Sequence, residues 1–330
     1  MNCTDARVIN QRCDYYAGQG LCKLPKRVFC AEYTGENVKR KITSISASGV
    51  DNYRSCHTKW LLDSFKGISS PGIGKAFAFG RVGHMALAEY YKDGNVNLKL
   101  VGPVLNTYKI NNTDQHSTNV MAINLAVLLE NYFLFYPQGE FPNADVEVPI
   151  PLKGTNFEDI NLRGYGLHGF VDMWLPENKT IVEHKFLDTT ELKPLNYKVQ
   201  KIIYLAATGA SQIIINILRK PLTRPKRNET LDNYRQRVDE DIKGNPTKFF
   251  NRIPVNRDEY DMPIELNKLA NLMDEINMKI ASESFDENTQ NCRFIPCGYE
   301  SICETGCVDE TFTKRVIDPN RSLSSTLEEE

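Results

Sequence analysis

The stretch GFVDMWLPENKTIVEHKF, residues 169–186, consists of two apolar runs of strand length separated by PENK, which is typical of a tight turn. It predicts a hairpin of two antiparallel strands, with Asp172 on the first strand and Glu183 on the second. Because side chains alternate along a strand, Glu183 and Lys185 point to one face and His184 to the other. We therefore expect Asp172, Glu183 and Lys185 to share one face of a sheet.

Two carboxylates and a lysine on one face suit metal-assisted phosphodiester chemistry. Mg²⁺ binds one or two carboxylates together with water and phosphate oxygens. A neighbouring ammonium offsets the negative charge that builds up in the transition state. The alternative is an ordinary solvated Glu–Lys pair on a hairpin, and the short triplet EHK taken alone favours that alternative.

The segment that follows the hairpin, LNYKVQKIIYLAATGA (195–210), has the periodicity of a helix. Gln200 and Tyr204 are four residues apart and so lie on one face of that helix. Packed beside the strands, the helix would direct both side chains at the metal site or at a nucleotide.

The combined pattern GxxD, ExK and QxxxY resembles the nuclease domain of the PD-(D/E)XK superfamily, specifically its RecB-like branch. Two further segments are similar to that branch. ITSISASGVDNYRSCHTKWLLDSF (42–65) is similar to its opening helix, with Tyr53, Cys56, Lys59 and Trp60 at the matching positions. FAFGRVGHMALAEYY (77–91) is similar to a helix whose histidine, here His84, joins the metal ligands.

A third similarity lies in the cysteines of FDENTQNCRFIPCGYESICETGC (285–307). They resemble those of the iron-sulfur subset, which includes the CRISPR-associated exonuclease family and the AddB nuclease domain. The resemblance implies a [4Fe-4S] cluster held by Cys56, Cys292, Cys297 and Cys303, with zinc as the second choice. Cys307 is a competing last ligand, and disulfides are a weaker use of nine cysteines, an odd number.

The resemblance implies a mechanism and a set of residues. His84, Asp172, Glu183 and the backbone carbonyl of His184 would hold one or two Mg²⁺ or Mn²⁺ ions. Lys185 would help to activate water for in-line attack, while Gln200 and Tyr204 would position the lysine or the strand.

The order of expected elements agrees with the core of this branch. Residues 43–91 contain two helices joined by a Gly- and Ser-rich loop, and residues 118–135 form an apolar helix. A strand at 144–152 precedes the hairpin, and a buried strand at 211–219 follows the Gln200–Tyr204 helix. The expected fold class is α/β, with a restriction-endonuclease-like mixed sheet flanked by helices, helical additions, and a cysteine-bound cluster joining the N- and C-terminal segments.

Three regions are expected along the chain. Residues 1–42 form an arm that contains Cys3, Cys13, Cys22 and Cys30, either bound to zinc or with free thiols. Residues 43–307 form the nuclease domain. Residues 308–330 are polar and are expected to be a disordered tail.

Composition limits the environment and the partners. A transmembrane helix needs about 18 consecutive apolar residues, and no run in the sequence is expected to reach that length. We therefore expect a cytoplasmic protein without membrane contact. If a phage encodes it, it would act in the bacterial host cell. The net charge of −2 gives no indication of nucleic-acid binding, because domains that bind nucleic acid are often strongly basic. A local basic run is the favoured phosphate-contacting segment, and it contains Arg219, Lys220, Arg224, Lys226 and Arg227.

The expected function is a metal-dependent DNA exonuclease acting on single-stranded ends in recombination, repair or phage replication. The sequence of residues 229–256 resembles that of phage-encoded members of this nuclease group. The expected partners are DNA and either further copies of the chain or a recombination or replication protein. The alternatives are an endonuclease of the same fold, a non-catalytic DNA-binding scaffold subunit and, ranked last, an electron-transfer protein.

Overall fold

The computed structural model describes residues 41–152, 162–193, 195, 197–294 and 297–314. The chain divides into two compact units. Of the described residues, the first unit combines 41–71, 162–166 and those between 268 and 314, and the second unit combines 72–152 and those between 167 and 267. The boundary between the two units at residues 267 and 268 falls within helix α9 (Met262–Ser282).

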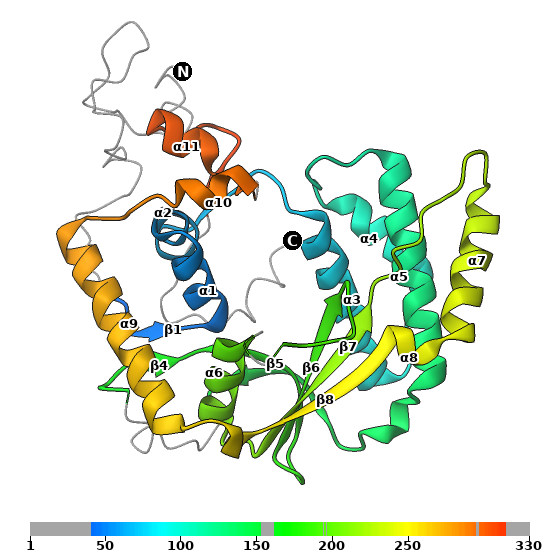
Figure 1. The fold of residues 1–330 in the computed structure, drawn as a ribbon, viewed down its shortest axis with the longest axis horizontal. Helices are drawn as coiled ribbons and strands as arrows, with labels where there is room; N and C mark the ends of the chain where they lie inside the picture. Colours follow the sequence, from blue (N-terminus) through cyan, green and yellow to red (C-terminus); the bar gives the residue numbers. More distant parts are fainter. Residues whose placement is uncertain (1–40, 153–161, 194, 196, 295–296, 315–330) are drawn as a thin grey trace, which may run out of the picture. The chain divides into compact units, whose positions relative to one another are not determined.

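A five-stranded mixed sheet forms the centre of the second unit, in the order β3-β5-β6-β7-β8 (Figure 1). The strands are β3 (Asp145–Ile150), β5 (Gly169–Leu175), β6 (Thr180–Leu187), β7 (Gln212–Arg219) and β8 (Phe250–Asn256). β6 and β7 are parallel, and the other neighbours are antiparallel. The predicted three-strand meander and the buried strand after it are confirmed.

Strands β5 and β6 form the predicted hairpin. Met173 pairs with Val182 and Leu175 pairs with Thr180, around a turn at residues 176–179. The parallel pairing of β6 with β7 requires a crossover, which helix α6 (Lys198–Thr208) provides. This is the predicted Gln200–Tyr204 helix.

Helices surround this sheet. They are α3 (Lys75–Asp93), α4 (Val101–Thr107), α5 (Gln115–Phe135), α7 (Leu231–Gly244) and α8 (Pro246–Phe249), with short 3₁₀ turns η3 (Leu98–Leu100), η4 (Gln138–Glu140) and η6 (Arg257–Glu259). Phe186 on β6 packs with Phe79 on α3, whereas Lys185 bonds to Gln200 on α6. Because successive side chains of β6 face opposite ways, α3 and α6 cover opposite faces of the sheet.

Helix α5 is the core helix of the second unit. Asp114 caps it by accepting a hydrogen bond from the Ser117 N–H at 2.7 Å, so it begins one turn before the predicted start. By length and composition α5 could cross a membrane, which contradicts the expectation that no run approaches this limit. Leu125 and Leu128 are nonetheless fully buried in the core of the second unit, as in the core helix of a globular fold.

The first unit is mainly helical. Its elements are β1 (Ser44–Ile45), α1 (Ala47–Ser55), α2 (His57–Trp60), the π-helical turn η2 (Leu61–Phe65), β2 (Ile68–Ser69), β4 (Gly166–Leu167, at the junction of the units), α10 (Thr289–Phe294), α11 (Glu300–Thr305) and β9 (Thr313–Lys314). The predicted opening helix is interrupted at Cys56, whose backbone is extended and whose Sγ accepts the Lys59 N–H at 3.5 Å.

Side-chain hydrogen bonds join the three segments of the first unit. The Tyr53 hydroxyl donates to Glu275 at 2.8 Å, and the Tyr165 hydroxyl donates to Asp274 at 2.7 Å. Both acceptors lie on α9, so this helix connects the early segment with residues 162–166.

The first residues of the expected tail, 308–314, belong to the described part of the chain, and residues 315–330 lie outside it. Val308 packs against a small core cluster of the first unit, and Phe312 is buried in it. Strand β9 pairs with β2. Burial of these two apolar side chains explains why residues 308–314 are packed on the first unit and are not disordered.

Candidate active site

Asp172 lies where strands β5 and β6 separate. The last ladder pair before this point joins Met173 to Val182. Beyond it the His184 N–H donates to Asp172 Oδ2 at 2.7 Å, so a side chain replaces a partner in the ladder. His84 Nδ1 lies 3.1 Å from Asp172 Oδ1. Burial would raise the pKa of Asp172, but His84 and the nearby cations lower it overall, so this carboxylate is ionised.

Glu183 and Lys185 lie on the face of β6 that α6 covers, as the alternation predicted. Lys185 Nζ donates to Glu183 Oε1 at 2.7 Å and to Gln200 Oε1 at 2.8 Å. The Gln200 amide donates to Glu183 Oε1 at 2.7 Å and to the Tyr204 hydroxyl at 2.9 Å. The structure therefore brings the four predicted side chains into one connected network.

The charges of this network oppose its burial. Burial, followed by the charge of Asp172, raises the pKa of Glu183 to about 7, although Lys185 acts in the other direction. Burial lowers the pKa of Lys185, but the Glu183 and Asp172 carboxylates raise it more. The two carboxylates therefore favour the protonated, cationic form of Lys185.

His84 is positioned by the packing of α3 on β6. A Cβ atom built on Gly83 would lie 2.2 Å from the Phe186 ring, so only glycine allows this close approach. Burial lowers the pKa of His84, but Asp172 raises it more. His84 therefore lies beside Asp172, and its role as a metal ligand stays a prediction.

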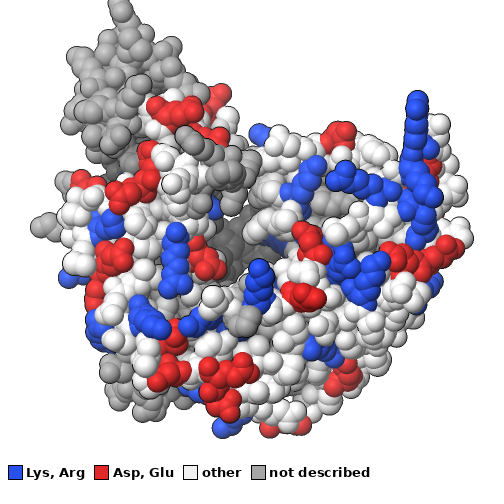
Figure 2. Space-filling model, viewed as in Figure 1, with Lys and Arg blue, Asp and Glu red and all other residues white. Residues whose placement is uncertain are grey.

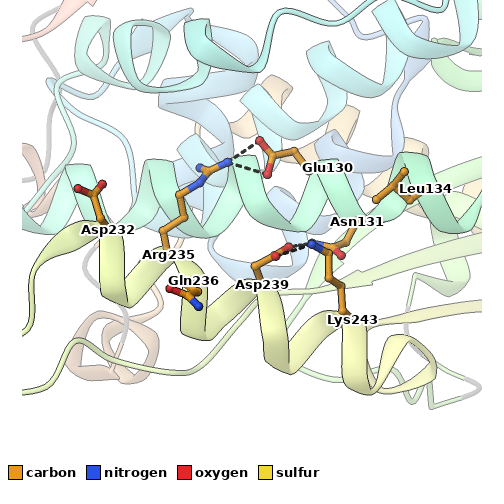
Figure 3. A pocket seen from close by; sticks show the side chains of 8 residues that line it. All are labelled: Glu130, Asn131, Leu134, Asp232, Arg235, Gln236, Asp239 and Lys243. Carbon is orange, nitrogen blue, oxygen red and sulfur yellow. Dashed lines mark hydrogen bonds and ion pairs between the residues drawn. The ribbon is translucent and has the colours of Figure 1, made fainter.

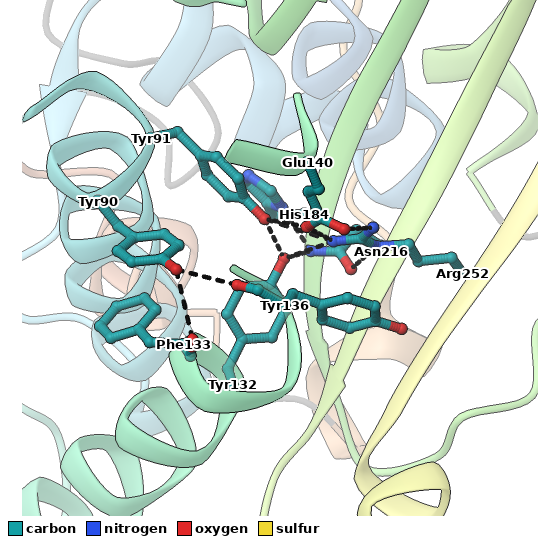
Figure 4. A network of polar contacts seen from close by, with 9 residues as sticks. All are labelled: Tyr90, Tyr91, Tyr132, Phe133, Tyr136, Glu140, His184, Asn216 and Arg252. Carbon is teal, nitrogen blue, oxygen red and sulfur yellow. Dashed lines mark hydrogen bonds and ion pairs between the residues drawn. The ribbon is translucent and has the colours of Figure 1, made fainter. Parts of the chain in front are cut away.

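The side chain of His184 points to the other face and enters a buried polar network (Figure 4). Asn216 Nδ2 donates to His184 Nδ1 at 2.7 Å, and the ring stacks on Tyr91 with centroids 5.7 Å apart. Burial lowers the pKa of His184 to about 3, so the ring is neutral. Arg252 Nη1 extends the network to Glu140 at 2.7 Å. The His184 side chain is therefore structural.

One carboxylate oxygen of the site has no hydrogen-bond partner and is available to bind a metal ion. Among the described residues, no three His, Cys, Asp or Glu side chains already converge to hold a metal ion. Asp172 is engaged by His84 and by the His184 N–H. Glu183 Oε2, however, is buried without a hydrogen-bond partner, which is costly unless a ligand satisfies it.

Glu147 is an acidic residue that sequence reasoning missed. Within β3 it falls opposite Asp172, between the pairs Val146–Met173 and Val148–Val171. Its φ of 52° is left-handed, which is rare for a non-glycine residue in a strand. Burial and then the charge of Asp172 raise the pKa of Glu147, so this carboxyl group interacts electrostatically with Asp172. The unusual backbone is invisible in the alternating sequence ADVEVPIPL.

A model of the PD-(D/E)XK nuclease superfamily matches residues 44–304. The chain belongs to this superfamily. No curated protein matches it significantly. Solved structures with some similarity include a phage-related exonuclease from Haemophilus somnus 129PT, with 11% identity, a TM-score of 0.32, and coverage of 62% of this chain and 82% of that one. SSO0001 has 15% identity, a TM-score of 0.33, and coverage of 83% and 92%. At these TM-scores the two structures support no conclusion about this chain.

Four cysteines of this PD-(D/E)XK protein influence one another within the first unit. Burial and then the charge of Glu287 raise the pKa of Cys303 to about 12, with smaller contributions from Cys297, Cys56 and Cys292. Cys56 Sγ accepts the Asn288 N–H at 3.5 Å, and Cys297 Sγ accepts the Tyr299 N–H at 3.4 Å. These are the predicted thiols, and all are free in the structure. Cys3, Cys13, Cys22 and Cys30 lie outside the described residues.

The predicted basic run follows β7. Arg219 Nε donates to the Asp188 carbonyl at 3.1 Å, and Lys220 Nζ lies 2.9 Å from the Asp188 carboxylate. Arg224, Lys226 and Arg227 are exposed. Only this latter part of the run therefore presents side chains freely to solvent, and its role in binding phosphate stays a prediction.

A cavity of about 470 Å³ lies between α5 and α7, and the residues that line it differ from those of the Glu183–Lys185 network (Figure 3). Its charges satisfy one another, since Arg235 pairs with Glu130, and Asp239 accepts from Asn131 and Lys243. None of the predicted catalytic residues lines it. This cavity is therefore distinct from the predicted site on β5 and β6.

Proposed function

We propose that this chain is a divalent-metal-dependent deoxyribonuclease that hydrolyses phosphodiester bonds. The observation that carries the proposal is the buried Lys185–Glu183 contact of 2.7 Å, next to the ionised Asp172. A surface ion pair would not need Gln200 to fix both partners. This arrangement supports the catalytic interpretation over a solvated Glu–Lys pair.

His84, Asp172, Glu183 and the backbone carbonyl of His184 would hold one or two Mg²⁺ or Mn²⁺ ions. When bound, such an ion polarises a phosphoryl oxygen and lowers the pKa of water. The unpartnered Oε2 of Glu183 supports this assignment, because carboxylate oxygens are the ligands that Mg²⁺ prefers.

Lys185 places a fixed positive charge where negative charge builds on the phosphoryl group. Gln200 holds the ammonium group through its Oε1, and Tyr204 holds the Gln200 amide in turn. The ring of Tyr197 lies 4.7 Å from the Lys185 nitrogen and restricts it further. Gln200 and Tyr204 are therefore assigned as positioning residues.

We propose DNA with free, single-stranded ends as the substrate, which makes the enzyme an exonuclease of recombination, repair or phage replication. Lys and Arg side chains are interspersed with Asp and Glu on the face shown in Figure 2. Phosphate contacts are therefore expected at local positions, with Arg224, Lys226 and Arg227 as exposed contributors.

Cleavage assays test this proposal. Anaerobically purified protein is incubated with end-labelled single- and double-stranded linear DNA and with closed circles, in Mg²⁺, Mn²⁺ or EDTA. We expect metal-dependent loss of linear single strands. Cutting of circles would identify an endonuclease, and binding without any cutting would identify a scaffold.

Variants connect the activity to the site. Glu183→Gln and Lys185→Met are expected to lower kcat by at least about 100-fold. Lys243→Met is the matched control, because Lys243 is exposed and pairs with Asp239 four residues earlier in α7. Native rates in both site variants would refute the assignment.

We also propose that Cys56, Cys292, Cys297 and Cys303 bind a [4Fe-4S] cluster, with zinc as the second choice. The backbone N–H groups that donate to Cys56 and Cys297 support metal-bound thiolates, since such hydrogen bonds tune cluster sulfurs. Iron, acid-labile sulfide and zinc should be measured in the native chain and in Cys56→Ser. Loss of metal in Cys56→Ser but not in Cys307→Ser would support this ligand set, whereas equal metal content in all three proteins would exclude it.

A further inference from the structure

Helix α3 carries an exposed aromatic ring in line with His84, one of the proposed metal ligands. Phe77 is 58% exposed although it is a large apolar side chain. Phe77 and His84 are seven residues apart, which is about two helical turns, so both project from nearly the same side of α3. The axial separation of their Cα atoms is about 10 Å at 1.5 Å per residue.

The surface of α3 between Phe77 and His84 is not covered by a side chain at Gly80. Gly80 lies between them on the same side, and a Cβ atom built on it would meet no other atom within 4 Å. Gly83, on the buried side of α3, has the opposite environment, because its Cβ would clash with Phe186. The exposed side of α3 thus offers an open path from Phe77 to His84.

Positive charge borders this path. Arg81 is exposed, and its guanidinium carbon lies 5.6 Å from the centroid of the Tyr108 ring, which supports the side chain. Among the described residues, no carboxylate forms an ion pair with Arg81. Lys75, in the first turn of α3, is also exposed. The path therefore suits an anionic ligand.

We propose that Phe77, Gly80 and Arg81 form a subsite for an unpaired segment of nucleic acid that leads into the catalytic site. Phe77 stacks on one base, the backbone crosses Gly80, and Arg81 contacts a phosphate. The inference rests on the proposed function and deepens it, because stacking on Phe77 requires a base whose face is free. It selects single-stranded over fully paired substrate.

The chemistry of this face favours nucleic acid over a protein partner. One exposed ring between a cation and a bare glycine is the combination that binds bases and phosphates. The exposed apolar neighbour Met85 lies one turn beyond Arg81, at 44% exposure, so the face alternates apolar and cationic side chains. Continuity with His84 places the bound strand at the metal ligands.

Binding can be measured without cleavage, by fluorescence anisotropy of a labelled thymidine oligonucleotide with the full chain in EDTA. Phe77→Ala is expected to raise Kd by roughly tenfold or more, as for loss of one stacked base. Phe77→Trp should retain native affinity, and fluorescence of the new tryptophan should be quenched as the oligonucleotide saturates the protein. Leu100→Ala is the matched control, because Leu100 is 53% exposed on a different element, η3.

Two more variants test the path and the charge. Gly80→Leu should weaken oligonucleotide binding by filling the open surface, although leucine favours a helix more than glycine does. Arg81→Gln should lower the slope of log Kd against log salt by about one phosphate contact. Circular dichroism and thermal unfolding of each variant verify that the fold is native.

The outcomes separate this inference from the proposed function. If Phe77→Ala binds the oligonucleotide as tightly as native protein and Leu100→Ala do, the subsite is wrong even if the protein cleaves DNA. An equal loss of affinity for blunt duplex would also overturn it, since paired bases offer no free face. Selective loss for single strands supports the subsite, even if Lys185→Met shows that cleavage resides elsewhere.

Discussion

Asn216 is the buried amide at the centre of the polar network beside strand β6. Its side chain is fully buried on β7, its Oδ1 accepts from Arg252 Nε at 3.1 Å, and its Nδ2 donates to the Tyr132 hydroxyl at 2.8 Å and to His184 Nδ1 at 2.7 Å. Replacement by leucine, which cannot form these bonds, therefore tests how much the network stabilises the fold.

The cost of Asn216→Leu follows from the partners that it leaves behind. The three lost hydrogen bonds contribute about 1 kcal/mol each. Tyr132 still bonds to Tyr91 at 2.7 Å and Arg252 still bonds to Glu140, but His184 Nδ1 loses its partner, at about 1–3 kcal/mol. Burial of the leucine returns about 2 kcal/mol. We expect a net loss of ~2–4 kcal/mol in the free energy of unfolding.

Urea unfolding of the full chain measures this loss. The control is Gln212→Leu on the same strand, where one exposed hydrogen bond to Asn256 at 2.9 Å is removed, and we expect a change below about 0.5 kcal/mol. A separate transition of the first unit does not affect the comparison, because both residues lie in β7. If the two variants unfold with free energies within 0.5 kcal/mol of each other, the network is not the stabilising feature that we infer.

Three further predictions concern packing, strain and pH. Gly83→Ala should destabilise the chain by about 1–3 kcal/mol through its clash with Phe186, whereas Gly80→Ala on the same helix should stabilise it by up to about 1 kcal/mol, and equal melting temperatures would contradict the packing argument. Glu147→Gly should keep or raise thermal stability by about 1 kcal/mol by relieving a φ of 52°, while DNA cleavage falls, and native cleavage would place Glu147 outside the site. Burial lowers the pKa of Lys66 from 10.5 to about 8, so the unfolded chain binds more protons between these values. The free energy of unfolding should therefore rise between pH 8 and 10.5 by up to about 3 kcal/mol at 1.36 kcal/mol per pKa unit, and Lys66→Met should abolish the rise.

The sequence carried enough local information to predict the β5–β6 hairpin and the helix after it. Two apolar runs separated by PENK fixed a short antiparallel ladder, and strand alternation then put Glu183 and Lys185 on one face. The spacing of Gln200 and Tyr204 placed both on one helical face. These features depend on neighbours within a few residues, which is why a single sequence can show them.

Features that depend on distant segments were not predictable in this way. β8 (Phe250–Asn256) contains Pro254 and polar residues, so it lacks an apolar alternation, yet it pairs along most of β7. The basic run gave no sign that Arg219 and Lys220 contact Asp188 from the loop after β6. The contact of His84 with Asp172 spans 88 positions and was expected only through a resemblance.

Strand β6 explains why catalysis and folding should respond to different substitutions. Glu183 and Lys185 face α6, while His184 between them faces Asn216 and the buried network. A shift of register by one residue would exchange these faces and bury the wrong side chains. Asn216 fixes His184 by a specific hydrogen bond and Gly83 fixes Phe186 by close packing, so both hold β6 in one register. Substitutions at Glu183 or Lys185 should therefore remove activity from a stable fold, whereas substitutions at Asn216 or Gly83 should lose activity only as the fold is lost.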